Sequence, residues 1–436
     1  YNIGNNIEII RSLNPSLPFI TTSFARGDWE RHRIWYELLH GSRGHIIWDD
    51  KNDGFAAKDA KPAERGLEVE RYYNEIRNGL GALLIASARQ EDPIAIHYSQ
   101  PSMRTEWMLA QRPHGEAWVE RGSAKERMDS EFLRLRESWC KVIEDLGLQY
   151  NFVAYEQVER GELTRGGYRA LILPRSTSLS EAEAQEIRAF AAAGGLVIAD
   201  GVPGRFDEHS RLLSKPRLEG VKMTVVDALP YYQQRLMGKE GDIHASAATL
   251  FRAQGIRPRF AGKGADGKPV VGVETRVFRN GAATIVGLLT NPQLRVNELG
   301  PPEFKSNERF ETARKVTLHL PAEMYVYDVR AAKPLGRLKE LAVDLGPYDP
   351  AIYALTPEPV PALRATAPAR ASRGDAMEIG LAFDGAAPAE KQVFHVEVRD
   401  PSGTLQYPYS GNVVAVGGIA SKTVPLALTD PAGTWR

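Results

Sequence analysis

The stretch that decides the fold is YRALILPRSTSLSEAEAQEIRAFAAAGGLVIADG, residues 168–201. It holds two apolar runs, YRALILPRST and LVIADG, separated by a segment with the pattern of a helix. Ser180 stands at the expected N-cap with Glu183 three residues later, a capping box, and Gly194-Gly195 follows the helix as a stop signal. Apolar strands joined by a helix are typical of a parallel sheet that is covered on both faces.

The same pattern extends toward the N-terminal side of this stretch. PIAIHYS (93–99) and YNFVAYEQV predict further buried strands. AKERMDSEFLRLRESWCKVIEDLGL (124–148) predicts a long amphipathic helix between them. Because helices and buried strands alternate, we predict a doubly wound, flavodoxin-like domain over residues 91–238.

Residues 1–90 repeat this alternation on a smaller scale. LPFITTSF (17–24) and GHIIWDD (44–50) predict two buried strands, and helices are predicted at 5–15, 28–41 and 62–89. Strands that are apolar throughout again indicate a parallel sheet. Two strands cannot close a barrel, so they fit either the last two units of one or part of an open sheet.

The pattern then changes to that of antiparallel strands. VVGVETRVFRNGAATIVGLLTN (270–291) predicts a hairpin with Asn280-Gly281 at its turn. Further short strands between Gly and Pro turns predict a β-sandwich domain over residues 239–357. The remainder, 358–436, is predicted to hold a Pro/Ala-rich linker and a partial immunoglobulin-like β-sandwich. The fold class is therefore multidomain α/β plus all-β.

Composition excludes several classes of protein. Acidic and basic residues number 55 each, which argues against a nucleic-acid partner held by bulk electrostatics. Cys140 is the only cysteine and lies within a predicted helix, so a disulfide within the chain and a cysteine metal site are excluded. The nine histidines show no metal-site spacing, and we expect neither a metal nor another cofactor.

No apolar run approaches the roughly 18 residues that are needed to span a bilayer. The composition fits a cytoplasmic or a periplasmic location, and no signal peptide is visible in this chain. The chain begins at Tyr1 without an initiator methionine and ends at LTDPAGTWR, the start of a strand. We therefore expect the parent protein to be longer.

Aromatic and polar residues gather where the two N-terminal strands end. The second strand ends in Trp48-Asp49-Asp50, and Arg26 and Trp29 follow the first. A tryptophan face stacks on the apolar side of a sugar ring, and carboxylates hydrogen-bond its hydroxyls. The pattern therefore favours a sugar site at this rim. The alternative is a strand end whose aspartates cap the next turn.

Taken in order, these segments resemble the rear part of the family-42 glycoside hydrolases, the β-galactosidases with a trimerisation domain. PFITTSFARGDWERHRIWYELLHGSRGHIIWDD is similar to strand 7, helix 7 and strand 8 of their (β/α)8 barrel. PIAIHYSQPSMRTEW and the stretch 168–201 are similar to their flavodoxin-like trimerisation domain, and this is the more specific match. The resemblance covers roughly residues 1–356 and implies that 1–90 is the C-terminal portion of a barrel.

The resemblance implies a retaining glycosidase and a homo-oligomer, most simply a trimer. One catalytic Glu of such enzymes follows strand 4, which this chain lacks. The other ends strand 7, near Thr22–Phe24 here, and Ser23 occupies that position instead of a carboxylate. We expect the surviving half of the site to be lined by these residues: Tyr1, Asn5, Ser23, Arg26, Trp29 and Trp48 for substrate binding, and Asp49 and Asp50 for catalysis. Asn5 could instead cap the helix that follows it.

Three functions therefore stand open. The first is a divergent, β-galactosidase-like glycoside hydrolase that acts on an oligosaccharide or glycoside. The second, which the missing strand-7 carboxylate favours, is a non-catalytic carbohydrate-binding or scaffolding protein derived from such a hydrolase. The third makes the flavodoxin-like domain an active amidotransferase-like or ligand-binding domain. Cys140 would be the nucleophile only in the first of these forms, and its place within a helix rather than on a strand-to-helix elbow argues against that role.

Overall fold

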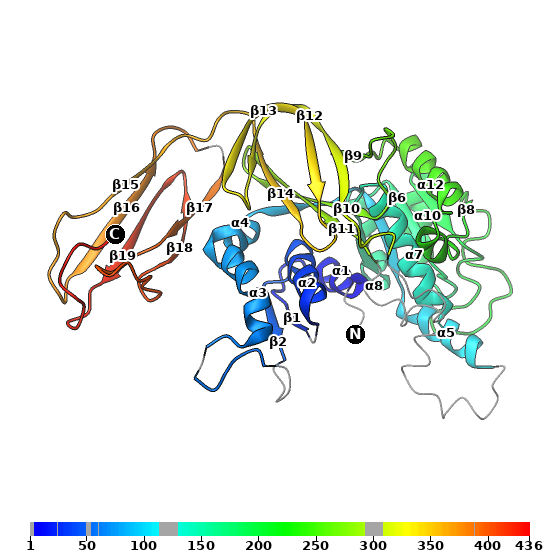
Figure 1. Ribbon diagram of the computed structural model, residues 1–436. Helices are drawn as coiled ribbons and strands as arrows, with labels where there is room; N and C mark the ends of the chain where they lie inside the picture. The colour runs from blue at the N-terminus through cyan, green and yellow to red at the C-terminus, as the bar shows by residue number, and fades with distance from the viewer. Residues whose placement is uncertain are drawn as a thin grey trace.

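Four β-sheets organise the described part of the computed structural model. The described residues are 4–23, 25–48, 54–59, 61–112, 130–292, 308–387 and 389–436. Figure 1 shows a central antiparallel sheet with a parallel-sheet unit on its right, a C-terminal sheet on its left, and the N-terminal helices and strands below. This mixture of α/β and all-β layers confirms the predicted fold class at that level, and the division into domains stays a prediction.

The N-terminal unit, residues 4–86, alternates helices with two parallel strands. β1 and β2 pair in parallel, from Ile20 opposite Gly44 to Ser23 opposite Ile47. The unit consists of α1 (Gly4–Leu13), β1 (Ile20–Ser23), α2 (Gly27–Leu39), β2 (Gly44–Ile47), α3 (Glu64–Glu75), the π-helical turn η1 (Ile76–Leu80) and α4 (Gly81–Ala86). The predicted helix–strand–helix–strand order is thus observed, and its assignment to a barrel remains a prediction.

The parallel-sheet unit, residues 94–256, follows the predicted doubly wound pattern. Its strands are ordered β5-β4-β6-β7-β8 and all pair in parallel, which is the 2-1-3-4-5 order of flavodoxin-like sheets. Its elements are β4 (Ile94–Tyr98), α5 (Gln100–Gln111), α7 (Glu131–Asp145), β5 (Asn151–Ala154), α8 (Tyr155–Glu159), α9 (Glu162–Arg165), β6 (Ala170–Leu173), α10 (Glu181–Ala192), β7 (Leu196–Ala199), β8 (Thr224–Val225), α11 (Tyr231–Leu236) and α12 (Gly241–Ala253).

Two details of this unit bear on the sequence analysis. The capping box of α10 forms as predicted: the Glu183 amide donates to Ser180 Oγ at 3.1 Å, and the Ser180 amide donates to Glu183 Oε2 at 2.7 Å. α12 lies beyond the predicted boundary at residue 238, and its Ala247 and Phe251 join the apolar core around Trp139 of α7. The helical part of the chain therefore continues further than the change of pattern suggested.

The central sheet is antiparallel and pairs strands that are distant in sequence. Its order is β13-β12-β14-β11-β10-β3, and β9 pairs with β12. β3 pairs with β10, so the predicted helical region 62–89 is wrong at its end, where the chain forms a strand. The strands are β3 (Ala88–Gln90), β9 (Ala261–Lys263), β10 (Val273–Asn280), β11 (Ala283–Thr290), β12 (Arg314–Asp328), β13 (Lys333–Leu345) and β14 (Ala351–Thr356). The hairpin predicted over 270–291 is confirmed as β10–β11.

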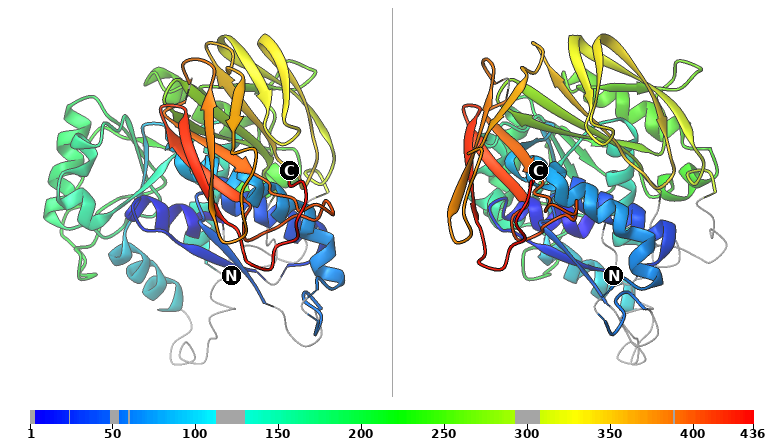
Figure 2. Two further views of the ribbon diagram at one scale, coloured as in Figure 1. Left: turned by 90° about the vertical axis from the view of Figure 1, so that its left-hand side faces the viewer. Right: turned by 60° about the vertical axis from the view of Figure 1, so that its left-hand side comes forward.

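The C-terminal sheet has the order β15-β16-β19-β18-β17, and its pairs are antiparallel. Its strands are β15 (Leu363–Thr366), β16 (Ala376–Phe383), β17 (Lys391–Val396), β18 (Gly411–Val416) and β19 (Ile419–Pro425). β15 lies inside the Pro/Ala-rich stretch 356–372, which was predicted to be a linker. Figure 2 shows this sheet beside the helices of the N-terminal unit. There Asn412 Nδ2 donates to the Arg77 carbonyl at 2.8 Å, and the Arg77 guanidinium lies 4.6 Å from the Tyr407 ring.

Apolar packing and a buried ionic cluster join the N-terminal unit to the central sheet. Ile34, Trp35 and Leu39 of α2 belong to one core with Phe278 and Ile285 of the sheet. Beside this core, His40 places Nδ1 2.5 Å from Glu8 Oε1 and Nε2 2.7 Å from Glu274 Oε1, and all three side chains are buried. Burial opposes ionisation of Glu8, yet the nearby Arg89 and Arg11 guanidinium groups hold its pKa well below the usual range. These contacts fix α1 and α2 against the sheet.

Among the residues that the structure describes, no helix is both long and apolar enough to cross a membrane.

Candidate functional site

The β1–β2 pair presents one buried face and one exposed face. Successive side chains of a strand point to opposite faces, and residues paired in register share a face. Ser23 is buried and His45 nearly so, whereas Ile20, Ile46 and Trp48 are largely exposed, Trp48 at 55%. The exposed face of this pair therefore carries Trp48 at its carboxyl end, and the opposite face lies against α2.

On the buried face, His45 bridges two glutamates of α2. Its Nε2 lies 2.9 Å from Glu30 Oε1, and its Nδ1 lies 2.5 Å from Glu37 Oε2. Burial alone would lower the pKa of His45, but hydrogen bonds and charge from the two carboxylates raise it to about 9. His45 is therefore a cation at neutral pH and holds β2 to α2 from both sides of its ring.

The remaining oxygens of the two glutamates are also taken. Ser23 Oγ donates to Glu30 Oε2 at 2.5 Å, and the Thr21 hydroxyl donates to Glu37. Arg33 Nε donates to Glu37 Oε1 at 2.9 Å. Burial raises the pKa of Glu37, but these donors together with His45 outweigh it and hold the pKa below its usual value. Glu37 is thus ionised, and both carboxylates are buried and committed to protein partners.

Arg65 of α3 closes the carboxyl end of the strand pair. Its guanidinium donates to the carbonyl of Trp48 at 2.6 Å and to the carbonyl of Ala25 at 2.7 Å. Ala25 lies just after β1 and Trp48 just after β2, so one side chain contacts both chain segments that leave the strands. Arg65 is itself buried, and its charge lies 3.9 Å from Glu30 Oε2.

The structure brings together only part of the predicted site. Ser23 and Trp48 lie at the carboxyl ends of the strands but on opposite faces, and Arg26 is exposed at the N-cap of α2. Trp29 packs edge-on against Tyr348, with ring centroids 5.8 Å apart.

Asn5 points elsewhere, because its side chain donates to Glu137 Oε2 at 2.5 Å and accepts from Arg136 at 3.1 Å, both on α7. Tyr1, Asp49 and Asp50 lie outside the described residues.

Three residues of this site were not singled out in the sequence. Glu30, His45 and Arg65 each carry charge at positions that the fold buries. One signal was present: Glu30, Arg33 and Glu37 are spaced three and four residues apart, which places them on one face of a helix. His45 also alternates with the exposed Ile46 along its strand. No sequence pattern around Arg65 indicates that it contacts the carbonyls of Trp48 and Ala25.

Comparison with known proteins finds solved structures that have a similar fold. No protein-family model matches the chain, and no curated protein matches it in sequence. A β-galactosidase from Bacillus circulans sp. alkalophilus matches with a TM-score of 0.54 at 11% identity, over 80% of this chain and 57% of its own. A catalytic mutant of Gan42B, a GH42 β-galactosidase from G. stearothermophilus, matches with a TM-score of 0.50 at 13% identity, over 81% of this chain and 56% of its own.

The fold of the chain is therefore similar to that of these two β-galactosidases. The chain spans little more than half the length of these two β-galactosidase structures, 57% and 56%. The likeness concerns the fold, and it leaves activity to be argued from the residues.

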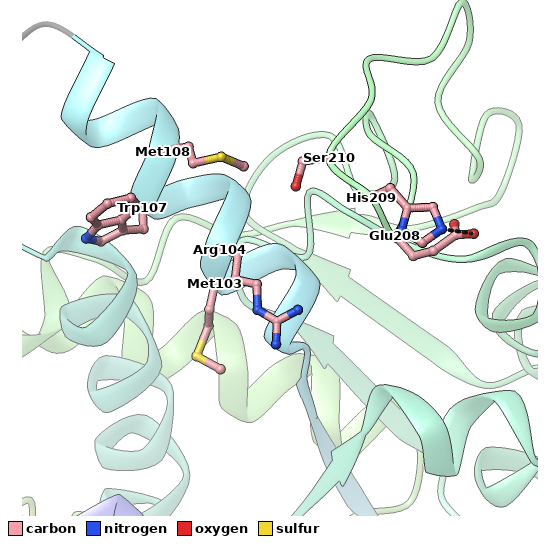
Figure 3. Close-up of a pocket in the computed structure, with 7 residues that line it drawn as sticks. All are labelled: Met103, Arg104, Trp107, Met108, Glu208, His209 and Ser210. Atoms are coloured by element: carbon pink, nitrogen blue, oxygen red, sulfur yellow. Dashed lines mark ion pairs between the residues drawn. The ribbon is translucent and has the colours of Figure 1, made fainter. Parts of the chain in front are cut away.

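The parallel-sheet unit contains a surface hollow. It has a volume of about 550 Å³ and lies between α5 and the loop that follows β7. Figure 3 shows Met108 and Arg104 on the side of α5 nearer Ser210 and His209, with Trp107 on the far side of the helix. These residues line it: Met103, Arg104, Trp107, Met108, Glu208, His209 and Ser210. The hollow belongs to a different unit from the β1–β2 rim.

Cys140, which belongs to the same unit, is not an exposed nucleophile. Its thiol is buried in α7, and burial raises its pKa well above the usual value, which disfavours the reactive thiolate. His97, at the end of β4, lies 2.8 Å from Ser176 Oγ and 2.9 Å from Glu183 Oε1 and is fully enclosed. Within the described residues, no group of three His, Cys, Asp or Glu side chains is arranged to hold a metal ion.

Proposed function

We propose that the protein is a divergent, β-galactosidase-like glycoside hydrolase that acts on an oligosaccharide or glycoside at the exposed face of β1 and β2. The observation that carries this proposal is Trp48, which stands largely exposed where β2 ends. An aromatic face at the carboxyl end of a parallel strand is suited to stack on a sugar ring. In this proposal β1, α2 and β2 are the last strand–helix–strand segment of a (β/α)8 barrel.

Catalysis is assigned to Asp49 and Asp50, the two residues that follow Trp48 in the sequence. Glycoside hydrolysis ordinarily uses two carboxyl groups, one as acid and one as base or nucleophile. Glu30 and Glu37 are excluded from that role by their buried hydrogen bonds to His45, Ser23 and Arg33. Asp49 and Asp50 would bind sugar hydroxyls, and one of them would protonate the leaving group.

Substitution of Trp48 tests the proposal. Trp48→Ala should weaken binding of methyl β-galactoside about tenfold, since stacking of this kind is worth about 1.4 kcal/mol. The matched control is Trp107→Ala, which removes a partly exposed tryptophan from the parallel-sheet unit. Equal binding by wild type and Trp48→Ala would contradict the site. Asp49→Asn and Asp50→Asn should abolish turnover of aryl glycosides, and unchanged turnover would remove both residues from catalysis.

A second candidate function is carbohydrate binding without hydrolysis. It is favoured by the end of β1, where Thr22 and Ser23 stand at the position at which the resemblance calls for a carboxylate. A panel of aryl glycosides separates the two functions. Turnover that depends on Asp49 or Asp50 supports hydrolysis, whereas sugar binding through Trp48 with no turnover of any glycoside supports the second function.

We also propose that the flavodoxin-like unit makes the protein a homotrimer. The support is the strand order of the parallel sheet together with the family resemblance. Light scattering coupled to size-exclusion chromatography tests this, and a mass of one chain at micromolar concentration would contradict it.

A further inference from the structure

One side chain outside the strands holds both ends of the proposed sugar site. Arg65 extends from the first turn of α3, and its two terminal nitrogens donate to the carbonyls of Trp48 and Ala25 at 2.6 Å and 2.7 Å. A guanidinium is planar and always charged, so two such bonds fix the direction of both carbonyls at once. The segments that follow β1 and β2 are therefore tied to a common point.

The surroundings of Arg65 make this tie rigid. The side chain is 3% exposed, which limits competition from water for its hydrogen bonds. Glu30 Oε2, 3.9 Å away, provides the opposite charge that a buried guanidinium requires. Glu30 is in turn held by Ser23 of β1 and His45 of β2. Glu30 of α2 therefore links Arg65 to both strands, and Ala25 and Trp48 lie just after those strands.

These contacts hold the backbone of Trp48 in place. Its backbone is held twice, because its amide donates to the Ser23 carbonyl at 3.1 Å and its own carbonyl accepts from Arg65. Its side chain remains largely exposed. A stacking platform binds a ring better when its backbone is fixed before the ligand arrives, because less conformational entropy is lost on binding.

We propose that Arg65 is a positioning residue for ligand binding at Trp48, fixing the segments after β1 and β2 so that the indole face is presented to a sugar ring. The inference rests on the proposed function for the identity of the ligand. Because Arg65 is buried, it acts in this proposal through the backbone carbonyls of Trp48 and Ala25.

Fluorine NMR of protein labelled with 5-fluorotryptophan measures the positioning directly. The chain has seven tryptophans, and the Trp48 signal is assigned as the one that disappears in Trp48→Phe. Arg65→Gln should shift and broaden the Trp48 signal and leave the other six in place. Arg65→Lys, which retains the charge but cannot donate in the same fork, should have an intermediate effect. The control is Arg71→Gln on the same helix, an exposed residue whose guanidinium pairs with Glu75.

Binding of methyl β-galactoside to the same proteins tests the consequence. Arg65→Gln should weaken binding about tenfold and Arg65→Lys about threefold, with Arg71→Gln unchanged. If Arg65→Gln does not fold, Arg65→Lys supplies both measurements. An unmoved Trp48 signal, or a moved signal with unchanged affinity, overturns the inference. If wild type binds no sugar or binds it independently of Trp48, the proposed function fails, and the fluorine signal still decides whether Arg65 positions Trp48.

Discussion

His45 Nε2 lies 2.9 Å from Glu30 Oε1, and this contact joins the second N-terminal strand to the helix that precedes it. With Glu37 on the other ring nitrogen, the imidazole is held as a cation between two buried glutamate side chains. The charge on His45 therefore contributes to the stability of the candidate site, and that contribution depends on pH.

The first prediction concerns this dependence. The folded pKa of His45 is raised to about 9 from an ordinary 6.5, so its contribution is fully present below about 6.5 and is lost as pH rises toward 9. A shift of this size corresponds to about 3 kcal/mol. His45→Gln should remove this part of the pH dependence in urea denaturation between pH 6 and pH 9.5. His209→Gln, at a residue with a 69% exposed side chain, should retain it, and an unchanged slope in His45→Gln would contradict the assignment.

The second prediction concerns the ion pair of Arg235 and Asp145. Arg235 Nε and its second terminal nitrogen donate to the two oxygens of Asp145 at 2.8 Å and 3.0 Å, and neither side chain is exposed. Arg235→Met leaves the Asp145 carboxylate buried without its counter-charge, which should lower the free energy of unfolding by about 3–5 kcal/mol. Arg71→Met, at an exposed arginine that pairs with Glu75, should change it by less than about 1 kcal/mol.

A matched double variant separates the charge from the packing in that ion pair. Arg235→Met/Asp145→Leu removes both charges, and thermal denaturation should show part of the lost stability restored. If the double variant is no more stable than Arg235→Met, the loss comes from packing around Phe310, whose ring centre lies 4.3 Å from the guanidinium.

The elements predicted correctly from sequence are those whose signals are local. The capping box at Ser180 and Glu183, the apolar runs on either side of α10 and the Asn-Gly hairpin turn each act within a few residues. β3 was missed because three residues after a helix become a strand only through pairing with Phe278 and its neighbours. α12 was not predicted, although Ile243, Ala247, Leu250 and Phe251 stand at helical spacing and pack into the core around α7.

The candidate site likewise has features that the local sequence predicts and features that depend on tertiary packing. Trp48 was predicted to stand at a strand end, and it does, because strand and terminus are both visible in the local pattern. The face that Ser23 occupies depends on pairing with β2 and on Glu30, seven residues away on a helix. The partners of Asn5 lie on α7, more than 130 residues away. Such contacts arise from tertiary packing, and no spacing in the sequence indicates them.

The third prediction concerns the packing of α2 on the central sheet. A Cβ atom at Gly287 of β11 would lie 2.8 Å from Leu39 Cδ2, and Leu39 is fully buried and cannot move away freely. Gly287→Ala should therefore lower the free energy of unfolding by about 1–3 kcal/mol through overpacking. The control is Gly201→Ala, where an added Cβ meets open space. Thermal denaturation of both variants checks this, and equal midpoints would show that α2 shifts to accept the methyl group.

The fourth prediction concerns Asp92, which precedes β4. The carboxylate accepts a hydrogen bond from the Gln149 amide at 2.8 Å, but burial raises its pKa to about 6 from an ordinary 3.8. Because the folded state holds the proton more tightly than the unfolded state, the ionised carboxylate lowers the free energy of unfolding. This loss is absent below about pH 3.8 and complete above about pH 6. The shift corresponds to about 3 kcal/mol.

Asp92→Asn keeps an oxygen acceptor for the Gln149 amide and removes the buried charge. The variant should therefore be more stable than wild type by about 2–3 kcal/mol at pH 8, and the advantage should vanish near pH 4. Urea denaturation at the two pH values measures the difference, with the exposed Asp59→Asn as control. An advantage of the same size at both pH values would mean that the gain comes from hydrogen bonding, because a buried charge can act only where the carboxyl group is ionised.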